Sequence, residues 1–136
     1  MSDEPRWIPV PVVLAIHDLL MAEHGGAAGP VDEVQLSAAL ARPRHKHAFD
    51  ETDLFALAAA HAFAIARDHP FTDGNKRVAL TLAGVFLELN GWRLDAPEAD
   101  AAHMTIALAA GAVSEEAYAL WLREQCVQAL PPGTTD

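Results

Sequence analysis

Apolar residues recur every three or four positions through most of the chain, a spacing that places them on one face of an α-helix. The first such segment covers residues 10–24, and the glycines that follow it provide a stop. A short helix is predicted to begin after Asp32, which can cap it, and to end at Pro43, because proline pushes the preceding residue out of the helical conformation. Residues 43–49 (PRHKHAF) are then expected to form a polar, basic linker.

The two strongest helical patterns lie in the middle of the chain. The first is predicted to begin at the cap residue Asp53 and to run to about Asp68, where Pro70 forces the chain out of the helix into an extended conformation. The second is predicted over residues 75–90 and is apolar on nearly every side. A helix of that kind is buried rather than amphipathic, so we expect it to be the central helix of the fold.

Two further helices, near residues 97–110 and 114–128, complete a predicted all-α bundle of about six helices around a central buried helix. The length of 136 residues suits one domain, which we expect to cover residues 9–128. Residues 1–8 are expected to form a flexible N-terminal arm, and residues 129–136 a disordered tail.

Composition limits the location and the partners of the protein. No apolar run reaches the roughly 18 residues that a membrane-spanning helix needs, and the N-terminus lacks a signal-peptide pattern, so we expect a cytoplasmic protein without a membrane partner. Cys126 is the single cysteine, which excludes an internal disulfide and a cysteine metal cluster. The net charge of −10 argues against direct binding to nucleic acid, whose phosphates select for basic surfaces.

The basic residues are gathered in one part of this acidic chain. Six of the nine Lys and Arg residues lie between Arg42 and Arg77, a stretch with a net charge of +1, while the rest of the chain carries −11. A local anion site would explain this distribution. Chance clustering on a solvated surface explains it equally well, so charge alone leaves both interpretations open.

The segment HPFTDGNKR, from His69 to Arg77, joins the two strong helices and contains the groups that phosphoryl transfer needs. Unpaired N–H groups at the start of the second helix attract anions, and Gly74 lets the backbone approach a ligand closely. Asn75 offers an amide to a phosphate oxygen. Lys76 and Arg77 place two cations where the helix dipole disfavours them, a cost that a bound anion would offset.

Two more residues of this segment have chemistry suited to catalysis. Asp73 is a hard oxygen ligand of the kind that Mg²⁺ takes together with substrate phosphates. His69, with an ordinary pKa of about 6.5, suits a general base. Each residue alone also has a structural interpretation, as a cap, a turn or a solvated cation, and it is their combination before a buried helix that indicates function. Phe71 is expected to be an apolar anchor that holds the loop down.

The segment HPFTDGNKR is similar to the signature of the Fic and Doc proteins, His-x-Phe-x-(Asp/Glu)-(Gly/Ala)-Asn-(Gly/Lys)-Arg. The similarity extends from IHDLLMAEHGG through TDLFALAAAHAFAIARDHPFTDGNKRVALTLAGVFLELNGW to about Gln125, which is most of the chain. The resemblance implies a set of roles within the motif: His69 deprotonates the target hydroxyl, Asp73 holds Mg²⁺, Gly74 and Asn75 form a phosphate nest, and Lys76 and Arg77 bind phosphate and the developing charge. Arg67, two residues before the motif, is a candidate nucleotide contact or a neighbour of one.

Two positions resemble the Doc branch of this superfamily. Fic adenylyltransferases usually have Gly where Lys76 stands, and a second Arg where Leu80 stands. The Doc resemblance implies that ATP binds in the reversed orientation and presents its γ-phosphate. The expected function is therefore the toxin of a toxin–antitoxin pair, a kinase that uses ATP and Mg²⁺ to modify a Ser/Thr hydroxyl of a protein, with elongation factor Tu as the implied target and arrested translation as the result. Two alternatives remain, a Fic-type protein adenylyltransferase and an inactive Fic-like scaffold.

The remaining histidines and the regulation of the protein complete the expectations. His45 and His47 lie where Fic proteins place a flap that aligns the target, and a flap contact, a solvated loop and a metal site remain open for them. His61 is expected to be a hydrogen-bonded core residue.

The inhibitory motif (Ser/Thr)-x-x-x-Glu-(Gly/Asn) of many Fic enzymes does not occur in the sequence. The resemblance therefore implies a separate small antitoxin whose disordered C-terminal segment folds on the toxin, in a groove expected to be apolar.

Overall fold

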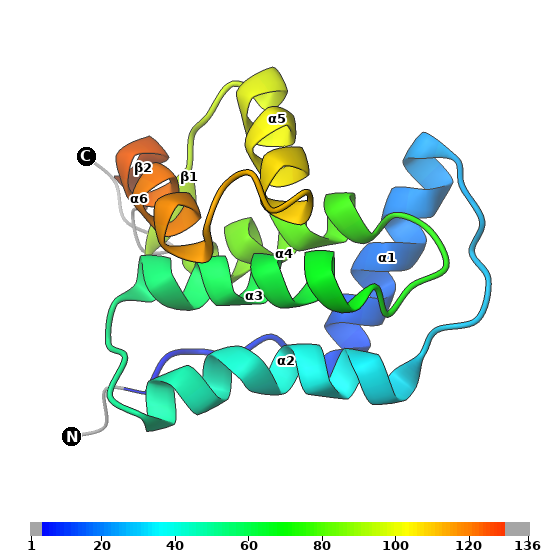
Figure 1. Ribbon diagram of the computed structural model, residues 1–136, viewed down its shortest axis with the longest axis horizontal. Helices are drawn as coiled ribbons and strands as arrows, with labels where there is room; N and C mark the ends of the chain where they lie inside the picture. Colours follow the sequence, from blue (N-terminus) through cyan, green and yellow to red (C-terminus); the bar gives the residue numbers. More distant parts are fainter. Residues whose placement is uncertain (1–3, 130–136) are drawn as a thin grey trace.

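The computed structural model describes residues 4–129 and shows a helical bundle with one short sheet (Figure 1). The described elements are α1 (Val10–His24), α2 (Glu33–Ala48), α3 (Leu54–Asp68), α4 (Asn75–Leu89), β1 (Trp92–Leu94), α5 (Glu98–Ala109), α6 (Glu115–Gln125) and β2 (Cys126–Gln128). The predicted all-α fold of about six helices is confirmed. Residues 1–3 of the expected arm and residues 130–136 of the expected tail lie outside the described residues.

Helices α3 and α4 pack side by side in the middle of the bundle, with α2 on one side and α5 and α6 on the other (Figure 1). Ten of the fifteen residues of α3 are buried, against six in α4. The central position that we expected for α4 is thus shared with α3. The seven alanines of α3 explain the difference, because their small side chains let four other helices approach closely.

Helix α2 does not end at Pro43 as expected but continues through it to Ala48, so the predicted linker over residues 43–49 is wrong. An internal proline removes one helical hydrogen bond and is costly by itself. Here Pro43 is buried against the bundle. Arg42, which precedes it, and Lys46, one turn after Arg42, both pair with Glu115 of α6. These tertiary contacts hold the last turns of α2 in place.

The two strands form an antiparallel pair in which Trp92 is opposite Gln128 and Leu94 is opposite Cys126. Residues 126–128 were expected to extend the last helix, and this expectation is wrong. Gly91, at a φ of 95°, turns the chain after α4 so that β1 presents its backbone to the C-terminal segment. The pairing joins segments far apart in sequence, which helical periodicity cannot reveal.

The described part of the expected N-terminal arm is packed rather than loose. Ile8 is only 4% exposed, and the Trp7 ring lies against Phe86 with 5.6 Å between the ring centroids. The Asn90 side chain accepts a hydrogen bond from the Arg6 N–H (2.8 Å) and donates one to the Arg6 carbonyl oxygen (3.1 Å). The two apolar residues of this short segment are enough to fix it to the bundle. No helix among residues 4–129 has the length and apolar character needed to cross a membrane.

Candidate active site

A cavity of about 420 Å³ opens at the N-terminal end of α4. One wall is the loop between α3 and α4 with the first turn of α4, and the opposite wall comes from Leu80 on α4 and from Ala102, Thr105 and Ile106 on α5. This volume lies in the range of small-molecule sites in proteins. The cavity therefore combines a polar wall, made by the motif residues, with an apolar one.

His69 stands at the rim of this cavity, in the position that ends α3. Its N–H donates to the Ile65 carbonyl oxygen, and its backbone adopts the left-handed conformation, with φ 49° and ψ 57°. The expectation of an extended conformation is wrong in this detail, because Pro70 disfavours only the right-handed helical region for the residue before it. Histidine is among the residues that enter the left-handed region more often than most. The His69 residue is exposed.

Asn75 closes the loop on itself. Its side-chain oxygen accepts a hydrogen bond from the Phe71 N–H (3.1 Å), and its side-chain nitrogen donates to the Phe71 carbonyl oxygen (2.9 Å). The amide that we expected to face a phosphate is therefore committed to the loop backbone. Phe71 is 4% exposed, which confirms its predicted role as an apolar anchor. What Asn75 contributes to the cavity is its backbone N–H at the start of α4.

The Asp73 carboxylate is held by two backbone N–H groups. Its Oδ1 accepts from Gly74 (2.8 Å), and its Oδ2 accepts from Ala27 (3.3 Å), in the segment that follows α1. Each carboxylate oxygen has about two acceptor sites, so one on each remains for another ligand. Gly74 has a φ of 84°, which favours glycine, and it precedes α4 without any side-chain cap. The first N–H groups of α4 are therefore free to bind an anion.

Lys76 and Arg77 occupy the first turn of α4, are exposed and line the cavity. Neither forms an ion pair with any residue of the described chain. The helix dipole disfavours cations at this end, so both side chains and the uncapped helix favour the same partner, an anion. The two cations, Asp73 and the first residues of α4 line one cavity.

His17 of α1 also belongs to this region, although it was not among the predicted site residues. It is 2% exposed, its ring stacks on Phe71 with 4.1 Å between centroids, and its Nε2 lies 2.9 Å from the carbonyl oxygen of Asp73. The available signal was its spacing, because His17 shares the buried face of α1 with Val13 and Met21, four residues before and after it.

Comparison with known proteins shows the family to which the chain belongs. The profile of the Fic/DOC family matches residues 7–87, which include α3, the loop and most of α4. The chain belongs to the Fic/DOC family. It is also 38% identical over 120 residues to the protein named "Protein kinase doc" from Escherichia phage P1, an alignment that covers 87% of this chain and 94% of that relative. The expected membership is thereby confirmed.

Arg67 does not join the other motif residues of this Fic/DOC chain. Its guanidinium pairs with Asp68 (Nε to Oδ1, 2.9 Å) and lies over the Phe63 ring, 5.1 Å from the centroid. It lines a different cavity, beside Arg42 and Lys46 of α2. Arg67 therefore lies outside the cavity that the motif residues line, because its side chain folds back along α3 towards a residue one turn earlier. The nucleotide contact stays a prediction.

His45 and His47 also lie away from the candidate active site. Both occupy the last turn of α2, which a short connection joins to the start of α3. His69 is at the other end of α3, whose fifteen residues span about 22 Å. The structure thus places this segment away from the loop that carries the motif, and a flap contact with a target stays a prediction. His47 packs edge-on against the Trp7 ring at 5.8 Å, and no group of three metal-binding side chains occurs among residues 4–129.

The residues present fit a magnesium–nucleotide complex. Mg²⁺ is commonly held by one or two carboxylates together with substrate phosphates, and Asp73 supplies one carboxylate with free acceptor sites beside the uncapped N-terminal end of α4. Leu80 adds to the apolar wall one turn after Arg77. In this family member, the helix face that carries the first arginine therefore continues as hydrocarbon rather than as a second cation.

Proposed function

We propose that this chain is the toxin of a toxin–antitoxin pair and a cytoplasmic kinase that transfers a phosphoryl group from Mg–ATP to a Ser/Thr hydroxyl of a protein. One observation carries the proposal: exposed His69, the Asp73 carboxylate and the uncapped, cationic start of α4 line a single cavity. A base, a metal ligand and an anion site are the parts that phosphoryl transfer requires. The relative from phage P1, which aligns with nearly the whole chain, is named a protein kinase and so supports the reaction class.

The chemistry assigned to each group follows from its place. His69 accepts the proton of the incoming hydroxyl at an imidazole nitrogen, and its left-handed backbone between α3 and buried Pro70 fixes where the ring leaves the chain. The N–H groups at the start of α4, with Lys76 and Arg77, stabilise negative charge on the transferred phosphoryl group. Asp73 would hold Mg²⁺, which supplies further neutralisation of the phosphate charge.

Phosphate transfer is preferred over AMP transfer because of the residues beyond the first helical turn. Lys76 extends a cation into the cavity where an adenylyltransferase of this superfamily has glycine, and Leu80 provides hydrocarbon where it has a second arginine. Both differences resemble the Doc branch. An inactive scaffold is less well supported, because a scaffold has no need for two cations in the first turn of a helix, where the dipole disfavours them.

The target that the Doc resemblance implies is elongation factor Tu, with arrested translation as the result. The test is incubation of the purified protein with Mg–ATP and purified elongation factor Tu, followed by intact mass measurement. We expect the mass increase of one phosphate, which His69→Ala should slow by about 10²–10⁴-fold. Because His69 is exposed, the substitution should leave the fold intact. His103→Ala, at another exposed histidine, should behave like wild type. An AMP adduct, or full activity of His69→Ala, would overturn the assignment.

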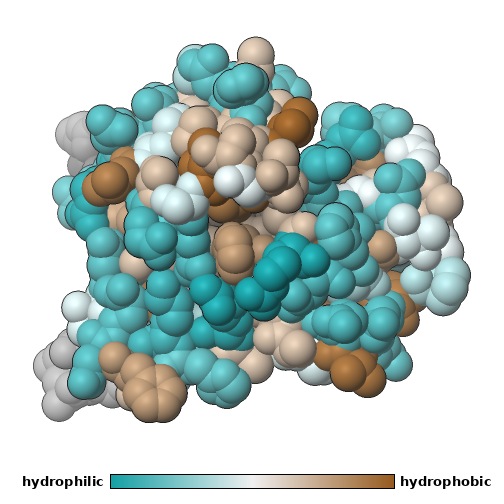
Figure 2. Space-filling model, in the orientation of Figure 1, coloured by the Kyte–Doolittle hydropathy of each residue, from teal (hydrophilic) through white to brown (hydrophobic). Residues whose placement is uncertain are grey.

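The proposal includes a small antitoxin as a partner. Its C-terminal segment would fold on the toxin, which lets a short peptide cover a wide surface at some cost in ordering. The face shown in Figure 2 is largely hydrophilic with separate apolar patches. Exposed apolar side chains occur on several outer helices, among them Leu19, Val34, Ile106 and Leu120. An apolar docking groove therefore stays a prediction.

Expression of the chain alone tests the pairing. We expect a strong growth defect that is relieved when a small neighbouring open reading frame is expressed together with it. The His69→Ala variant should remove the defect without removing the ability to bind that partner. Harmless expression of a protein that is active in the phosphorylation assay would mean that the toxin–antitoxin assignment is wrong.

A further inference from the structure

His17 contacts the candidate active-site loop from outside it. It lies in the middle of α1, 56 residues before Asp73, yet its Nε2 is 2.9 Å from the Asp73 carbonyl oxygen. A carbonyl oxygen can only accept a hydrogen bond, so Nε2 must carry the proton and donate it. This contact fixes the tautomer of a histidine that is 2% exposed and shielded from solvent.

The hydrogen bond from His17 sets the orientation of one peptide group. In a trans peptide the C=O and the following N–H point in opposite directions. With the Asp73 carbonyl held towards α1, the Gly74 N–H points away from α1, where it donates to Asp73 Oδ1 (2.8 Å). The same peptide plane therefore governs two features of the cavity, the position of the Asp73 carboxylate and the left-handed turn at Gly74 that starts α4.

The second contact of His17 is with the other end of the loop. Its ring stacks on Phe71 with 4.1 Å between centroids and 12° between the planes. The backbone of Phe71 is in turn bonded at both its N–H and its carbonyl group by the Asn75 side chain. One imidazole thus restrains the loop at residue 71 by stacking and at residue 73 by a hydrogen bond, on the side away from the cavity.

We propose that His17 is a positioning residue for phosphoryl transfer. Its Nε2–H holds the Asp73–Gly74 peptide so that the Asp73 carboxylate and the first N–H groups of α4 face the same cavity. This role rests on the proposed kinase function, and it concerns geometry rather than proton transfer. His17 acts through Asp73 and Gly74 and touches no substrate. A purely structural role, in filling the core beneath the loop, would need only the volume and the ring of the side chain.

Two substitutions separate the donor from the ring. His17→Phe keeps a ring for stacking on Phe71 and removes the donor, whereas His17→Gln removes the ring and brings an amide N–H close to the position of Nε2. His24→Phe is the matched control, because His24 lies on the same helix and is exposed. Its Nε2 lies 3.8 Å from Oε2 of neighbouring Glu23. The readouts are kcat and KM for ATP with the protein target, the Mg²⁺ concentration at half-maximal rate, and the melting temperature.

We expect His17→Phe to lower kcat by about 10- to 100-fold, the size of effect that a misplacement of about 1 Å can produce. It should also raise the Mg²⁺ requirement, with a smaller change in the KM for ATP. His17→Gln should recover most of the loss, and His24→Phe should match wild type. Equal losses in His17→Phe and His17→Gln, or a His17→Phe variant with the wild-type kcat and Mg²⁺ requirement, would overturn the proposal.

Amide hydrogen exchange of the free protein gives a reading that does not depend on activity. His17→Phe should speed exchange in the segment of residues 71–78 while leaving α6 unchanged, and unchanged exchange in that segment would refute the positioning role. If wild type transfers no phosphate, the proposed function fails and exchange still decides the role of His17. If His17→Phe does not fold, His17→Asn replaces it, because its amide is too short to reach the Nε2 position. Asn performing as well as Gln would then refute the proposal.

Discussion

Gly26 lies so close to Asp73 that a Cβ atom on the glycine would stand 2.8 Å from the carboxylate Oδ2. The next residue, Ala27, donates its N–H to that same oxygen. The glycine-rich segment after α1, which the sequence indicated only as the stop of the first helix, thus forms a backbone wall against the carboxylate expected to hold Mg²⁺. Backbone holds the carboxylate in place here, and a side chain at residue 26 would displace the carboxylate.

Gly26→Ala should therefore raise the Mg²⁺ requirement of the reaction by more than its loss of stability accounts for. We expect a several-fold higher Mg²⁺ concentration for half-maximal phosphorylation, because the new methyl group pushes Asp73 out of position. Gly25→Ala is the matched control. Both glycines have a positive φ, at 133° and 75°, so both variants carry backbone strain, but a Cβ at Gly25 meets no atom within 4 Å. Equal Mg²⁺ requirements in the two variants would contradict the contact.

Lys76→Ala should weaken phosphoryl transfer by about 10- to 100-fold if its ammonium group contacts phosphate, the effect expected for a hydrogen bond to a charged group. Lys76→Gly should lose at least as much, because it removes the same charge from an exposed position. Efficient AMP transfer is not expected in either variant, since Leu80 still forms the apolar wall. Arg93→Ala, at an exposed cation on β1, is the control. ATP affinity measured by calorimetry and adduct mass check the prediction, and unaltered rate and affinity would exclude a phosphate contact by Lys76.

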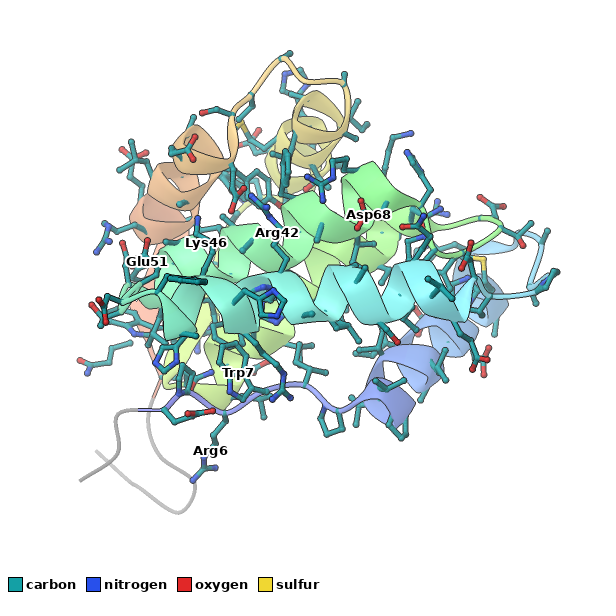
Figure 3. The ribbon with its side chains drawn as sticks, turned by 60° about the horizontal axis from the view of Figure 1, so that its bottom comes forward. Arg6, Trp7, Arg42, Lys46, Glu51 and Asp68 are labelled. Carbon is teal, nitrogen blue, oxygen red and sulfur yellow. The ribbon has the colours of Figure 1, made fainter. Side chains whose placement is uncertain are left out.

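Glu115→Gln should destabilise the fold by about 2 kcal/mol, in the range for hydrogen bonds to charged groups. The Glu115 side chain is only 7% exposed and pairs with both Arg42 and Lys46 (Nζ to Oε2, 3.1 Å). Figure 3 shows these two side chains on the part of α2 that faces α6. The variant leaves two cations facing a neutral amide. Glu116→Gln, at an exposed neighbour without an ion pair in the described chain, should be near neutral. Urea midpoints at a constant m-value measure both, and equal midpoints would contradict the prediction.

His61 should make the protein less stable in acid. Burial lowers the pKa of His61 from 6.5 to about 4, partly opposed by its hydrogen bond to the Leu57 carbonyl oxygen, while the charge of Arg44 lowers it further. The folded state therefore resists a proton that the unfolded chain binds below about pH 6.5. Stability should fall as the pH drops from about 6.5 to about 4, by as much as roughly 3 kcal/mol.

The check is the unfolding free energy at several pH values in wild type and in His61→Phe. The variant lacks the titrating group, so its stability curve should be flatter between pH 6.5 and 4, whatever the cost of the substitution at neutral pH. His103→Phe, at an exposed histidine, should keep the wild-type slope. Parallel curves for wild type and His61→Phe would show that another group causes the acid sensitivity.

The elements that the sequence predicted well are those whose signals are local. Helices α1, α3 and α4 begin and end within a residue of the prediction, because a capping residue, a glycine or a proline stands near each of their ends. Helix α2 differs because its continuation through Pro43 depends on Glu115, which lies more than seventy residues away. The strand pair likewise joins residues 92–94 with residues 126–128. Contacts over such separations leave no periodic pattern in the sequence.

In the candidate site, too, the local features were predicted from the sequence and the longer-range ones were not. A single segment holds the motif residues from His69 to Arg77, and all the polar and charged ones among them line one cavity, while Phe71 is buried beneath the loop. The details that depend on side-chain direction were not predictable: Arg67 turns towards Phe63, and the Asn75 amide turns back to Phe71. The position of His17 beside the loop could not be predicted for a further reason. A buried histidine on an apolar helix face has the same pattern whether it supports a site or only fills the core, and His61 on α3 shows that pattern without any contact to the cavity.

The two hydrogen bonds between the Asn90 side chain and the Arg6 backbone have a practical consequence for labelling the protein. The N-terminal segment is hydrogen-bonded to Asn90, and the Ala129 N–H donates to the carbonyl oxygen of Gly91, so both ends of the described chain are attached just after the C-terminal end of α4. The cavity lies at the opposite end of α4, about 22 Å along its axis. Fluorescent labels or a surface tether attached at Arg6 or Ala129 would therefore stand away from the cavity.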